Sequence, residues 1–524
     1  MRQLLTVTSI FVILLLSFTC AQTPRPRFTT EQEATTSRVL QSGQVSTRPL
    51  RLYVYDADAI SFLNSNTSIK ASGEIVNRNL DKLKKYFLAY FKVSSPDSMT
   101  TPATSCSGLN ILSMNSSSDY HLYLKVENTP NGAEALSSAS CLRNTDANPR
   151  PILGVVFINY AVFATSLRDE YGYFHAMVKE MFHLFGFNSS TFQNFPVFNS
   201  ANSTWGYQTM QTASLINGKW YYRVVVPDLV ARAKAFYNCA DITGLPLENG
   251  GGAGFSGAHW DKLWMGNEVM VAKHDSKAVI SEFTLAVLRA TGWWIIEEGG
   301  AQDYTWGKGD GCSHWQECPA STTSFENCQN TGSAQCSADY TNTGTCLSDT
   351  TLLENCKIRV AKNKYCNSKF ASDELYNDPT ETIGNESRCF EWQNGANSVT
   401  AKCHTSECTG SGIKITLQDG KVFTCTSGGQ KITVSGSDQI VCPDVSDFCG
   451  KFDQRCDSWC TSEGNGICMK GKKCLCFFGE NNGQCVVNPY AGMTSVTGQV
   501  INIKRNSFIA LPLIVLALLA LLFN

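Results

Sequence analysis

The sequence has little net charge and little histidine. Lysine and arginine number 43 against 45 aspartates and glutamates, which leaves a formal charge of −2. This balance gives no reason to expect nucleic acid as a partner, or an electrostatic attachment to lipid head groups. The content of 43% hydrophobic and 17% charged residues is that of a globular protein. The length of 524 residues allows two or three domains.

Long apolar runs are absent except at the two ends of the chain. Ile10–Phe18 follows the basic Arg2 and precedes small residues up to Ala21, a pattern typical of a secretory signal peptide. Phe508–Phe523 is short for a spanning helix, and no cytoplasmic charges follow it. It predicts a glycolipid-anchor signal, with attachment at Ser495 or Gly498. A single C-terminal membrane helix is the alternative, and both place the protein on the extracellular face of the plasma membrane.

Cysteine is scarce in the first part of the chain and dense in the second. Residues 22–310 contain only Cys106, Cys141 and Cys239, whereas residues 311–486 contain nineteen. Such density predicts disulfides formed in an oxidising compartment. Because three is odd, one early cysteine is either free or bridged to the cysteine-rich part. N-glycosylation sequons, which fit that compartment, begin at Asn66, Asn115, Asn188, Asn202 and Asn385.

The first part of the chain mixes strand and helix patterns. Alternating or continuous apolar runs predict strands over Arg48–Tyr55, Asp119–Val126 and Ile152–Asn159. Helical spacing of apolar residues predicts helices over Asn77–Phe91 and Ser166–Phe185. Strands mixed with long helices indicate an α+β or α/β domain.

The last cysteines have a regular spacing. Six of them, from Cys456 to Cys485, follow the pattern C-x3-C-x7-C-x5-C-x-C-x8-C, which is typical of an EGF-like module. Such modules act as spacers or binding units, so we assign it no catalysis.

The candidate site lies in the second predicted helix. Zinc proteases place two histidines one helical turn apart, as H-E-x-x-H, so that both rings reach one metal and the glutamate acts as base. Metzincins continue with a glycine, a third histidine and a methionine turn. Here Glu180, His183 and Gly186 occupy the expected positions, but Lys179 stands where the first histidine should be.

Several landmarks together resemble the leishmanolysin family. His259 lies 73 positions after Gly186, behind a glycine-rich approach, and Asn267–Met270 resembles the methionine turn. Other similar segments are Arg150–Gly154, Ser281–Trp294 and Trp306–Cys312. The resemblance covers roughly residues 48–486. It implies zinc-dependent peptide hydrolysis outside the cell, with Glu180 as base, His183 and His259 as zinc ligands and Met270 in the methionine turn.

The resemblance also implies an α+β fold and an order of domains. A metzincin-like catalytic domain with a long active-site helix is followed by a disulfide-rich domain and the EGF-like module. The expected segments are a signal peptide (1–21), a linker or short pro-segment (22–47), the metzincin domain (48–310), a cysteine-rich domain (311–441), the EGF-like module (442–486), a linker with the anchor site (487–507) and the hydrophobic anchor signal (508–524).

Lys179 departs from the family pattern in a way that bears on catalysis. A protonated amine has no lone pair for zinc and repels the ion. His175 cannot replace the missing ligand, because it lies about 12 Å along the helix axis from His183. His274 cannot be placed by spacing. The remaining histidines, which we expect on the surface or in the core, are His121, His314 and His404.

Two functions therefore remain open. One is a cell-surface zinc endopeptidase that acts on extracellular proteins or peptides with an unrecognised third ligand. The other is a non-catalytic pseudoprotease with a binding or adhesion role; a purely structural coat protein is a variant of it. If the scaffold is intact, we expect His183 and His259 to face each other above Met270. We also expect the Lys179 ammonium in the place of zinc, near enough to pair with Glu180.

Overall fold

A computed structural model gives the fold. It describes residues 47–486 except 66–69, 95–98, 129–133, 163–169, 217–218, 253, 274–275, 316–325, 329, 368–377, 396–397, 452–455, 458–459 and 461–464. The expected signal peptide, the first linker and the C-terminal anchor segments therefore lie outside the described residues. Within the described part, no helix has both the length and the apolar character needed to cross a membrane.

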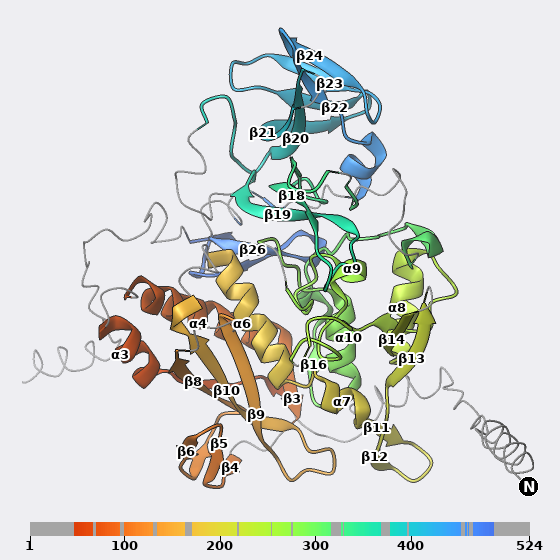
Figure 1. Ribbon diagram of the computed structural model, residues 1–524. Helices are drawn as coiled ribbons and strands as arrows, with labels where there is room; N and C mark the ends of the chain where they lie inside the picture. The colour runs from red at the N-terminus through yellow and green to blue at the C-terminus, as the bar shows by residue number, and fades with distance from the viewer. Residues whose placement is uncertain are drawn as a thin grey trace, which may run out of the picture.

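A four-stranded mixed sheet organises the first domain (Figure 1). Its strand order is β2 (Leu52–Tyr55), β8 (Tyr120–Glu127), β10 (Pro151–Asn159) and β9 (Leu136–Arg143). The first three strands are parallel, and β9 runs antiparallel at the edge. The sequence predicts β8 and β10 closely. The strand predicted over Arg48–Tyr55 is split into β1 (Thr47–Pro49), which pairs with another strand, and β2, so that prediction is wrong in its continuity.

Two long helices pack with this sheet. They are α4 (Lys70–Tyr90) and α6 (Glu170–Leu184), and α3 (Ala57–Ser65) precedes them. Nearly every described residue of α6 is buried, as expected for a helix enclosed on all sides. Phe87 of α4 makes edge contacts with Phe182 and Phe185, with ring centroids 6.2 and 5.0 Å apart. This aromatic packing fixes α6, and with it the candidate site.

Smaller elements complete the domain. β1, β3 and β16 form a small antiparallel sheet, and the other elements are further antiparallel strands and short helices. These elements are β1 (Thr47–Pro49), β3 (Phe91–Ser94), β16 (Ile295–Ile296), β4 (Met99–Thr101), β7 (Met114–Ser116), β5 (Thr104–Cys106), β6 (Leu109–Ile111), α7 (Ser189–Gln193), β11 (Phe195–Asn199), β12 (Thr204–Gln208), β13 (Gln211–Ile216), β14 (Lys219–Val224), β15 (Leu245–Pro246), α8 (Pro227–Tyr237), α9 (Lys262–Met265) and α10 (Glu282–Ala290).

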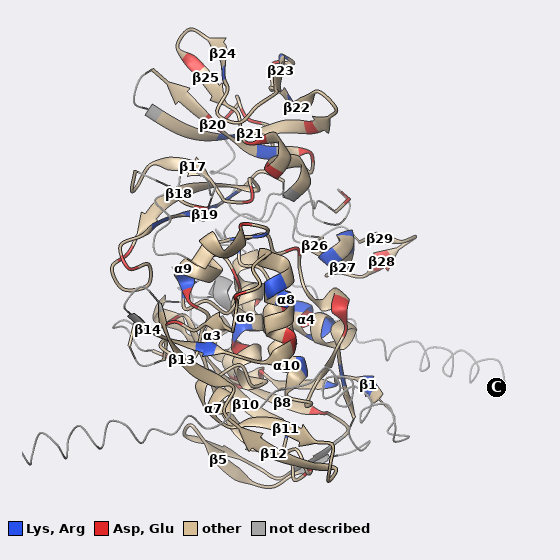
Figure 2. Ribbon diagram, turned by 90° about the vertical axis from the view of Figure 1, so that its right-hand side faces the viewer, with Lys and Arg blue, Asp and Glu red and all other residues tan. Residues whose placement is uncertain are grey.

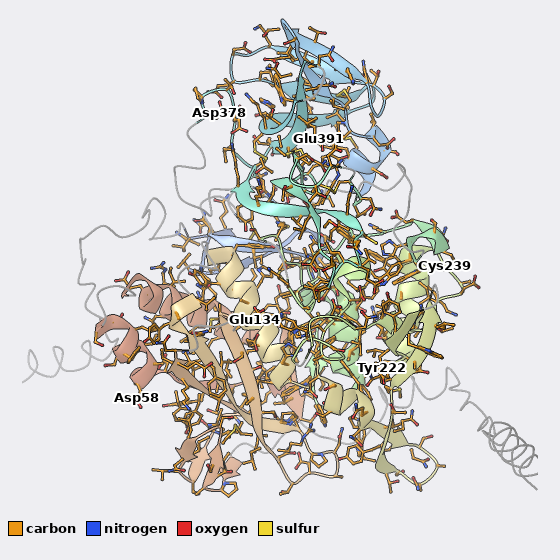
Figure 3. All side chains as sticks on the ribbon, viewed as in Figure 1. Asp58, Glu134, Tyr222, Cys239, Asp378 and Glu391 are labelled. Carbon is orange, nitrogen blue, oxygen red and sulfur yellow. A yellow bond between two sulfur atoms is a disulfide. The ribbon has the colours of Figure 1, made fainter. Side chains whose placement is uncertain are left out.

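The cysteine-rich part forms a second core above the first (Figure 1). A three-stranded sheet of β17 (Ala334–Cys336), β18 (Asn342–Ser348) and β19 (Lys357–Tyr365) leads to a six-stranded sheet. The members of that sheet are β20 (Ser387–Asn394), β21 (Ser398–Thr409), β22 (Gly412–Thr416), β23 (Val422–Cys425), β24 (Lys431–Ser435) and β25 (Asp438–Val441). Arg359 of β19 forms an ion pair with Glu391 of β20, labelled in Figure 3, which links the two sheets.

Disulfides cross-link this part of the molecule. Ten of them join described cysteines, and eight of these lie entirely between residues 328 and 485, with Cys239–Cys312 connecting the two parts. Cys239 is thus the early cysteine that bridges to the cysteine-rich part, because Cys106 pairs with Cys141. Cys408–Cys449 attaches the chain up to residue 449 to the six-stranded sheet, beyond the boundary at residue 441 expected from the sequence.

The last described segment returns to the first core. It contains β26 (Gly466–Met469), β27 (Lys473–Cys476), β28 (Glu480–Asn481) and β29 (Gln484–Cys485). Its Phe477 ring lies 5.4 Å from the ring of Phe174 on α6, and the Lys82 ammonium lies 4.9 Å from the same ring. Basic and acidic side chains are interspersed over the molecule (Figure 2), in keeping with the small net charge.

Candidate metal centre

Helix α6 delivers Glu180 and His183 and then ends at a glycine. Gly186 has φ +119°, a conformation that side chains rarely adopt, and a Cβ there would lie 2.6 Å from Trp293. The turn brings the Phe187 carbonyl back to the helix, where it accepts a 2.8 Å hydrogen bond from His183 Nδ1. Asn188 then caps α7 through Thr191 N and donates to the His183 carbonyl. Only glycine permits this close return of the chain.

His259 arrives from the glycine-rich segment. Its carbonyl accepts from Glu248 N, and its ring Nδ1 donates to the Phe255 carbonyl at 3.2 Å. The following residue, Trp260, is fully buried and donates its backbone N–H to the Met270 carbonyl at 2.9 Å. Met270, predicted to lie in a methionine turn, is therefore joined by a backbone hydrogen bond to the residue after His259, the predicted zinc ligand.

The two histidines face each other. His183 Nε2 lies 3.0 Å from His259 Nε2, although 76 residues separate them in sequence. Carbonyl oxygens only accept, so each ring must carry its proton on Nδ1. Both Nε2 atoms then direct lone pairs at the same point. Two nitrogens bound to one tetrahedral zinc at about 2.0–2.1 Å would be roughly 3.3 Å apart.

A proton shared between the Nε2 atoms of His183 and His259, the alternative to a metal ion, is disfavoured. Burial, with the positive charge of Lys179, lowers the pKa of His183 from 6.5 to about 3. The ring is therefore neutral at physiological pH, the form that binds metals. Hydrogen bonding of the outer nitrogen to a carbonyl is the usual way in which a protein orients a metal-binding imidazole.

The methionine turn is held by a buried carboxylate that the sequence did not single out. Glu268 accepts hydrogen bonds from Met270 N, Ser281 Oγ and Thr284 Oγ1, and Thr284 Oγ1 in turn accepts from Trp260 Nε1. Burial raises the pKa of Glu268 to about 7. Glu268 thus connects the segment Asn267–Met270, helix α10 and Trp260, the residue beside His259. In the sequence, only its place within Asn267–Met270 could have indicated this role.

A comparison with known protein families covers this part of the chain. The profile of the family described as leishmanolysin, Peptidase M8, matches residues 110–352. That range contains the helix, both histidines and the methionine turn. Residues 110–352 form a domain of the leishmanolysin family.

Individual relatives carry related names. A ciliated left-right organizer metallopeptidase of Danio rerio is 28% identical over 62% of this chain and 54% of its own length. A leishmanolysin-like peptidase of Drosophila melanogaster is 38% identical over 17% of this chain and 13% of its own. A leishmanolysin homolog of Crithidia fasciculata is 28% identical over 38% and 28%. The chain thus spans about half the length of the first of these relatives and less of the others.

Lys179 distinguishes this leishmanolysin-family chain from the H-E-x-x-H pattern. Its ammonium is buried and donates to the Ala272 carbonyl, just after the methionine turn, at 2.9 Å. Burial lowers the Lys179 pKa, while the charges of Glu180, Glu134 and Glu268 act in the opposite direction. Lys179 therefore stands in the sequence where the H-E-x-x-H pattern has its first histidine, and its ammonium is bonded to backbone.

The direct ion pair expected between Lys179 and Glu180 is not formed among the described residues. The Glu180 carboxylate accepts instead from Ser138 Oγ of β9, at 2.7 Å. Burial raises the Glu180 pKa, and Lys179 and the Ser138 hydrogen bond oppose the rise. The prediction was wrong because a serine distant in sequence competes for the carboxylate.

The other histidines lie apart from this pair. His175 bonds to the Tyr171 carbonyl and to Gln302, and His314 bonds to the Trp264 carbonyl. His121 contacts Tyr55 Oη, and His404 is buried in the second core. His274 lies outside the described residues.

Proposed function

We propose that this chain is an extracellular leishmanolysin-family pseudoprotease, which binds extended polypeptides without hydrolysing them through a catalytic zinc. The observation that carries the proposal is the Lys179 ammonium, which is bonded to the Ala272 carbonyl at the first-ligand position. A metal is the expectation for this family of metallopeptidases. The donor set of this chain fits it only in part.

The histidine side of the site fits a metal and the lysine side does not. Two neutral imidazoles aim their lone pairs at one point, as described above. A protonated amine offers no lone pair, and its charge opposes a nearby cation. A structural or catalytic zinc needs three or four protein ligands. If Glu180 completed the set, it would no longer be free to act as a base.

The edge strand β9 supports polypeptide binding. It is the terminal strand of the four-stranded sheet, so one row of its backbone groups has no partner strand within that sheet. Extended peptides commonly add to such an edge by backbone hydrogen bonds. Ser138 of β9 bonds to Glu180, so a peptide on this edge would lie beside the site. The buried fixed charges would orient its carbonyl groups without activating water.

The location and the modular design are parts of the same proposal. The disulfide content favours an oxidising compartment. Three disulfides close within Cys456–Cys485 and support an EGF-like unit with a spacer or adhesion role. Attachment to the outer membrane face, through a glycolipid or a single helix, remains as predicted from residues 487–524.

An active zinc endopeptidase is the second candidate, favoured by the preserved geometry of His183 and His259. Incubation of the purified protein with denatured casein, followed by mass spectrometry, separates the two. We expect no cleavage beyond that of the Glu180→Ala variant, and no effect of a zinc chelator. Lys179→His serves as the positive control. Wild-type cleavage that is lost in Glu180→Ala would establish the enzyme and contradict the pseudoprotease.

A further inference from the structure

The hairpin of β13 and β14 carries an exposed aromatic and apolar stripe. Leu215 lies opposite Trp220, and Ala213 lies opposite Tyr222. Residues opposite one another, and those two positions along, share one face of an antiparallel pair. Leu215, Trp220 and Tyr222 are 59%, 65% and 52% exposed, so this face is open to solvent.

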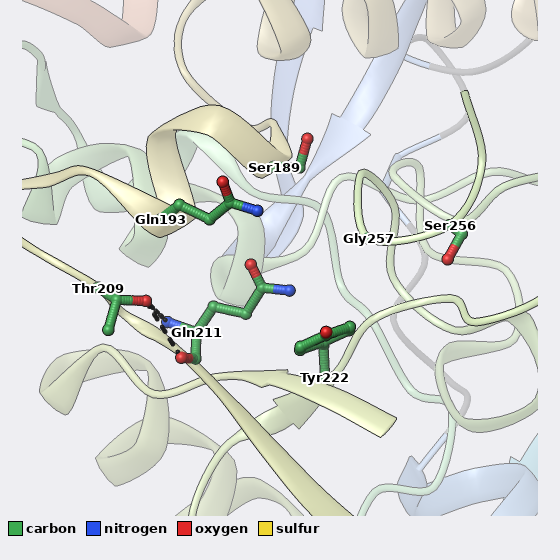
Figure 4. Close-up of a pocket in the computed structure, with 7 residues that line it drawn as sticks. All are labelled: Ser189, Gln193, Thr209, Gln211, Tyr222, Ser256 and Gly257. Atoms are coloured by element: carbon green, nitrogen blue, oxygen red, sulfur yellow. Dashed lines mark hydrogen bonds between the residues drawn. The ribbon is translucent and has the colours of Figure 1, made fainter. Parts of the chain in front are cut away.

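A pocket of about 350 Å³ lies at the inner end of the stripe. Gln211 is on the same face, two positions before Ala213, and Tyr222 belongs to both the stripe and the pocket wall. Figure 4 shows the amides of Gln193 and Gln211 directed into this space. The lining residues, from α7, the hairpin and the glycine-rich segment, are Ser189, Gln193, Thr209, Gln211, Tyr222, Ser256 and Gly257.

The chemistry of the wall is polar and uncharged. It contains two amides, three hydroxyls and one phenol, and no lysine, arginine, aspartate or glutamate. Gln211 is held at its backbone by Thr209, yet its buried Oε1 has no hydrogen-bond partner among the described residues. The Gln211 side chain lines the pocket wall together with that of Gln193. The pocket is therefore suited to a ligand rich in neutral hydroxyl or amide groups.

We infer that this pocket and the adjoining stripe bind a neutral saccharide. Sugar rings combine apolar C–H faces, which pack on Tyr and Trp rings, with hydroxyls that pair with amides and hydroxyl side chains. The Tyr222 ring and the Gln211 amide would make these two contacts inside the pocket, and Trp220 would extend the platform outward. An acidic glycan or a charged peptide would find no counter-charge in the wall. The volume is at the lower end of ligand pockets, which suits one or two sugar rings.

This binding site is independent of any metal. Ser256 and Gly257 precede His259, so a bound sugar would lie on the approach to the candidate metal centre without using its histidines. A glycoprotein could then present its glycan to this pocket and its polypeptide to β9.

Titration of the purified full-length protein with mannotriose, triacetylchitotriose and maltotriose tests the inference, with calorimetry and saturation-transfer NMR as readouts. An uncharged peptide of serine, asparagine and glutamine is run in parallel. Tyr222→Ala and Gln211→Leu should each weaken saccharide binding by about tenfold or more, because they remove the stacking face and one amide of the pocket wall. Tyr222→Phe, which keeps the ring, should bind within about twofold of wild type if stacking dominates.

The matched control is Tyr207→Ala, which removes an equally exposed tyrosine from β12, outside the pocket. It should leave saccharide binding unchanged. Binding of at least one saccharide with this pattern of variants supports the site. Absence of saccharide binding at millimolar concentration, equal affinity in all variants, or binding of the peptide in place of the sugars would overturn it. None of these outcomes depends on whether the protein hydrolyses peptides.

Discussion

The two sides of the candidate metal centre preserve different things. On one side, His183 and His259 keep both the residues and their supporting hydrogen bonds, to the carbonyls of Phe187 and Phe255. On the other, Lys179 keeps the place on helix α6 but exchanges an imidazole for an ammonium, bonded to Ala272. The site thus places two neutral imidazoles beside a position that carries an ammonium.

Contacts outside the predicted ligand positions support the site. The aromatic packing of α6, the turn at Gly186 and the Glu268 network around the methionine turn position the histidines by themselves. A positive charge at residue 179 stands near three carboxylates, as a metal ion would. Electrostatic balance can therefore be kept while Lewis acidity is lost.

Replacing Lys179 by histidine should have the largest effect, which is a gain in zinc affinity. Lys179→His supplies a third imidazole on the correct helix face, one turn before His183. We expect zinc affinity to rise on the order of 10³-fold, since even a residue that only supports a ligand changes affinity by about 10–100-fold. Competition with a zinc-selective fluorescent chelator measures it. Lys179→Gln, which removes the charge without adding a ligand of this kind, is the matched control, and an equal gain there would refute the ligand argument.

Disrupting the turn at Gly186, which ends the helix that carries both Lys179 and His183, should have the next largest effect, a loss of stability. Gly186→Ala forces a side chain into φ +119° and against Trp293, whose ring is held by Asn148. We expect a loss of about 3 kcal/mol of unfolding free energy. Thermal unfolding of the variant measures the loss. Gly206→Ala, where a Cβ would meet nothing within 4 Å, should change little; equal losses would show that the turn is not special.

His404 sharpens the comparison because it is buried without the carbonyl partners that the site histidines have. Neither of its ring nitrogens has a hydrogen-bond partner among the described residues. Burial, with the charge of Lys402, lowers its pKa from 6.5 to about 4. The unfolded chain then takes up a proton at a higher pH than the folded one. Stability should be complete above pH 6.5 and fall by up to about 3 kcal/mol toward pH 4.

The His404→Leu variant isolates this effect. It should remove that part of the pH dependence and leave stability at pH 7 equal or higher, because no hydrogen bond is lost. Calorimetric unfolding from pH 4 to 7 gives both quantities. A variant with the same pH profile as wild type would assign the dependence to other groups.

The smallest expected effect concerns two sequons. Asn188 Nδ2 donates to the His183 carbonyl, so a glycan there would disturb the histidine side, whereas Asn202 lies in an exposed turn. We expect glycan at Asn202 and none at Asn188. Enzymatic deglycosylation in ¹⁸O water with peptide mass spectrometry reads both sites at once. Occupancy at Asn188 would show that the α7 cap is open enough during synthesis to be modified.

The sequence predicted those features that depend on the order of landmarks along the chain. The meeting of His183 and His259 follows from such order. The odd number of early cysteines left two possibilities, a free thiol or a bridge to the later part, and the structure has the bridge Cys239–Cys312. It did not reveal that Ser138 would take the Glu180 carboxylate, because that contact depends on how β9 lies against α6. The role of Glu268 was hidden for the same reason: its three donors come together only when α10 packs on the methionine turn. The strand predicted over Arg48–Tyr55 divides because β1 pairs with β3 and β2 pairs with β8, a choice of partner strands that alternation along the sequence does not reveal.

The most direct test of the central claim is the zinc content of the purified wild-type protein. After dialysis against metal-free buffer, plasma mass spectrometry should find well below one zinc per chain, roughly a tenth or less, since two imidazoles fall short of a complete ligand set. Lys179→His, treated identically, should retain about one. A wild-type protein that keeps one zinc per chain would contradict the account and place this chain among the metal-loaded leishmanolysins.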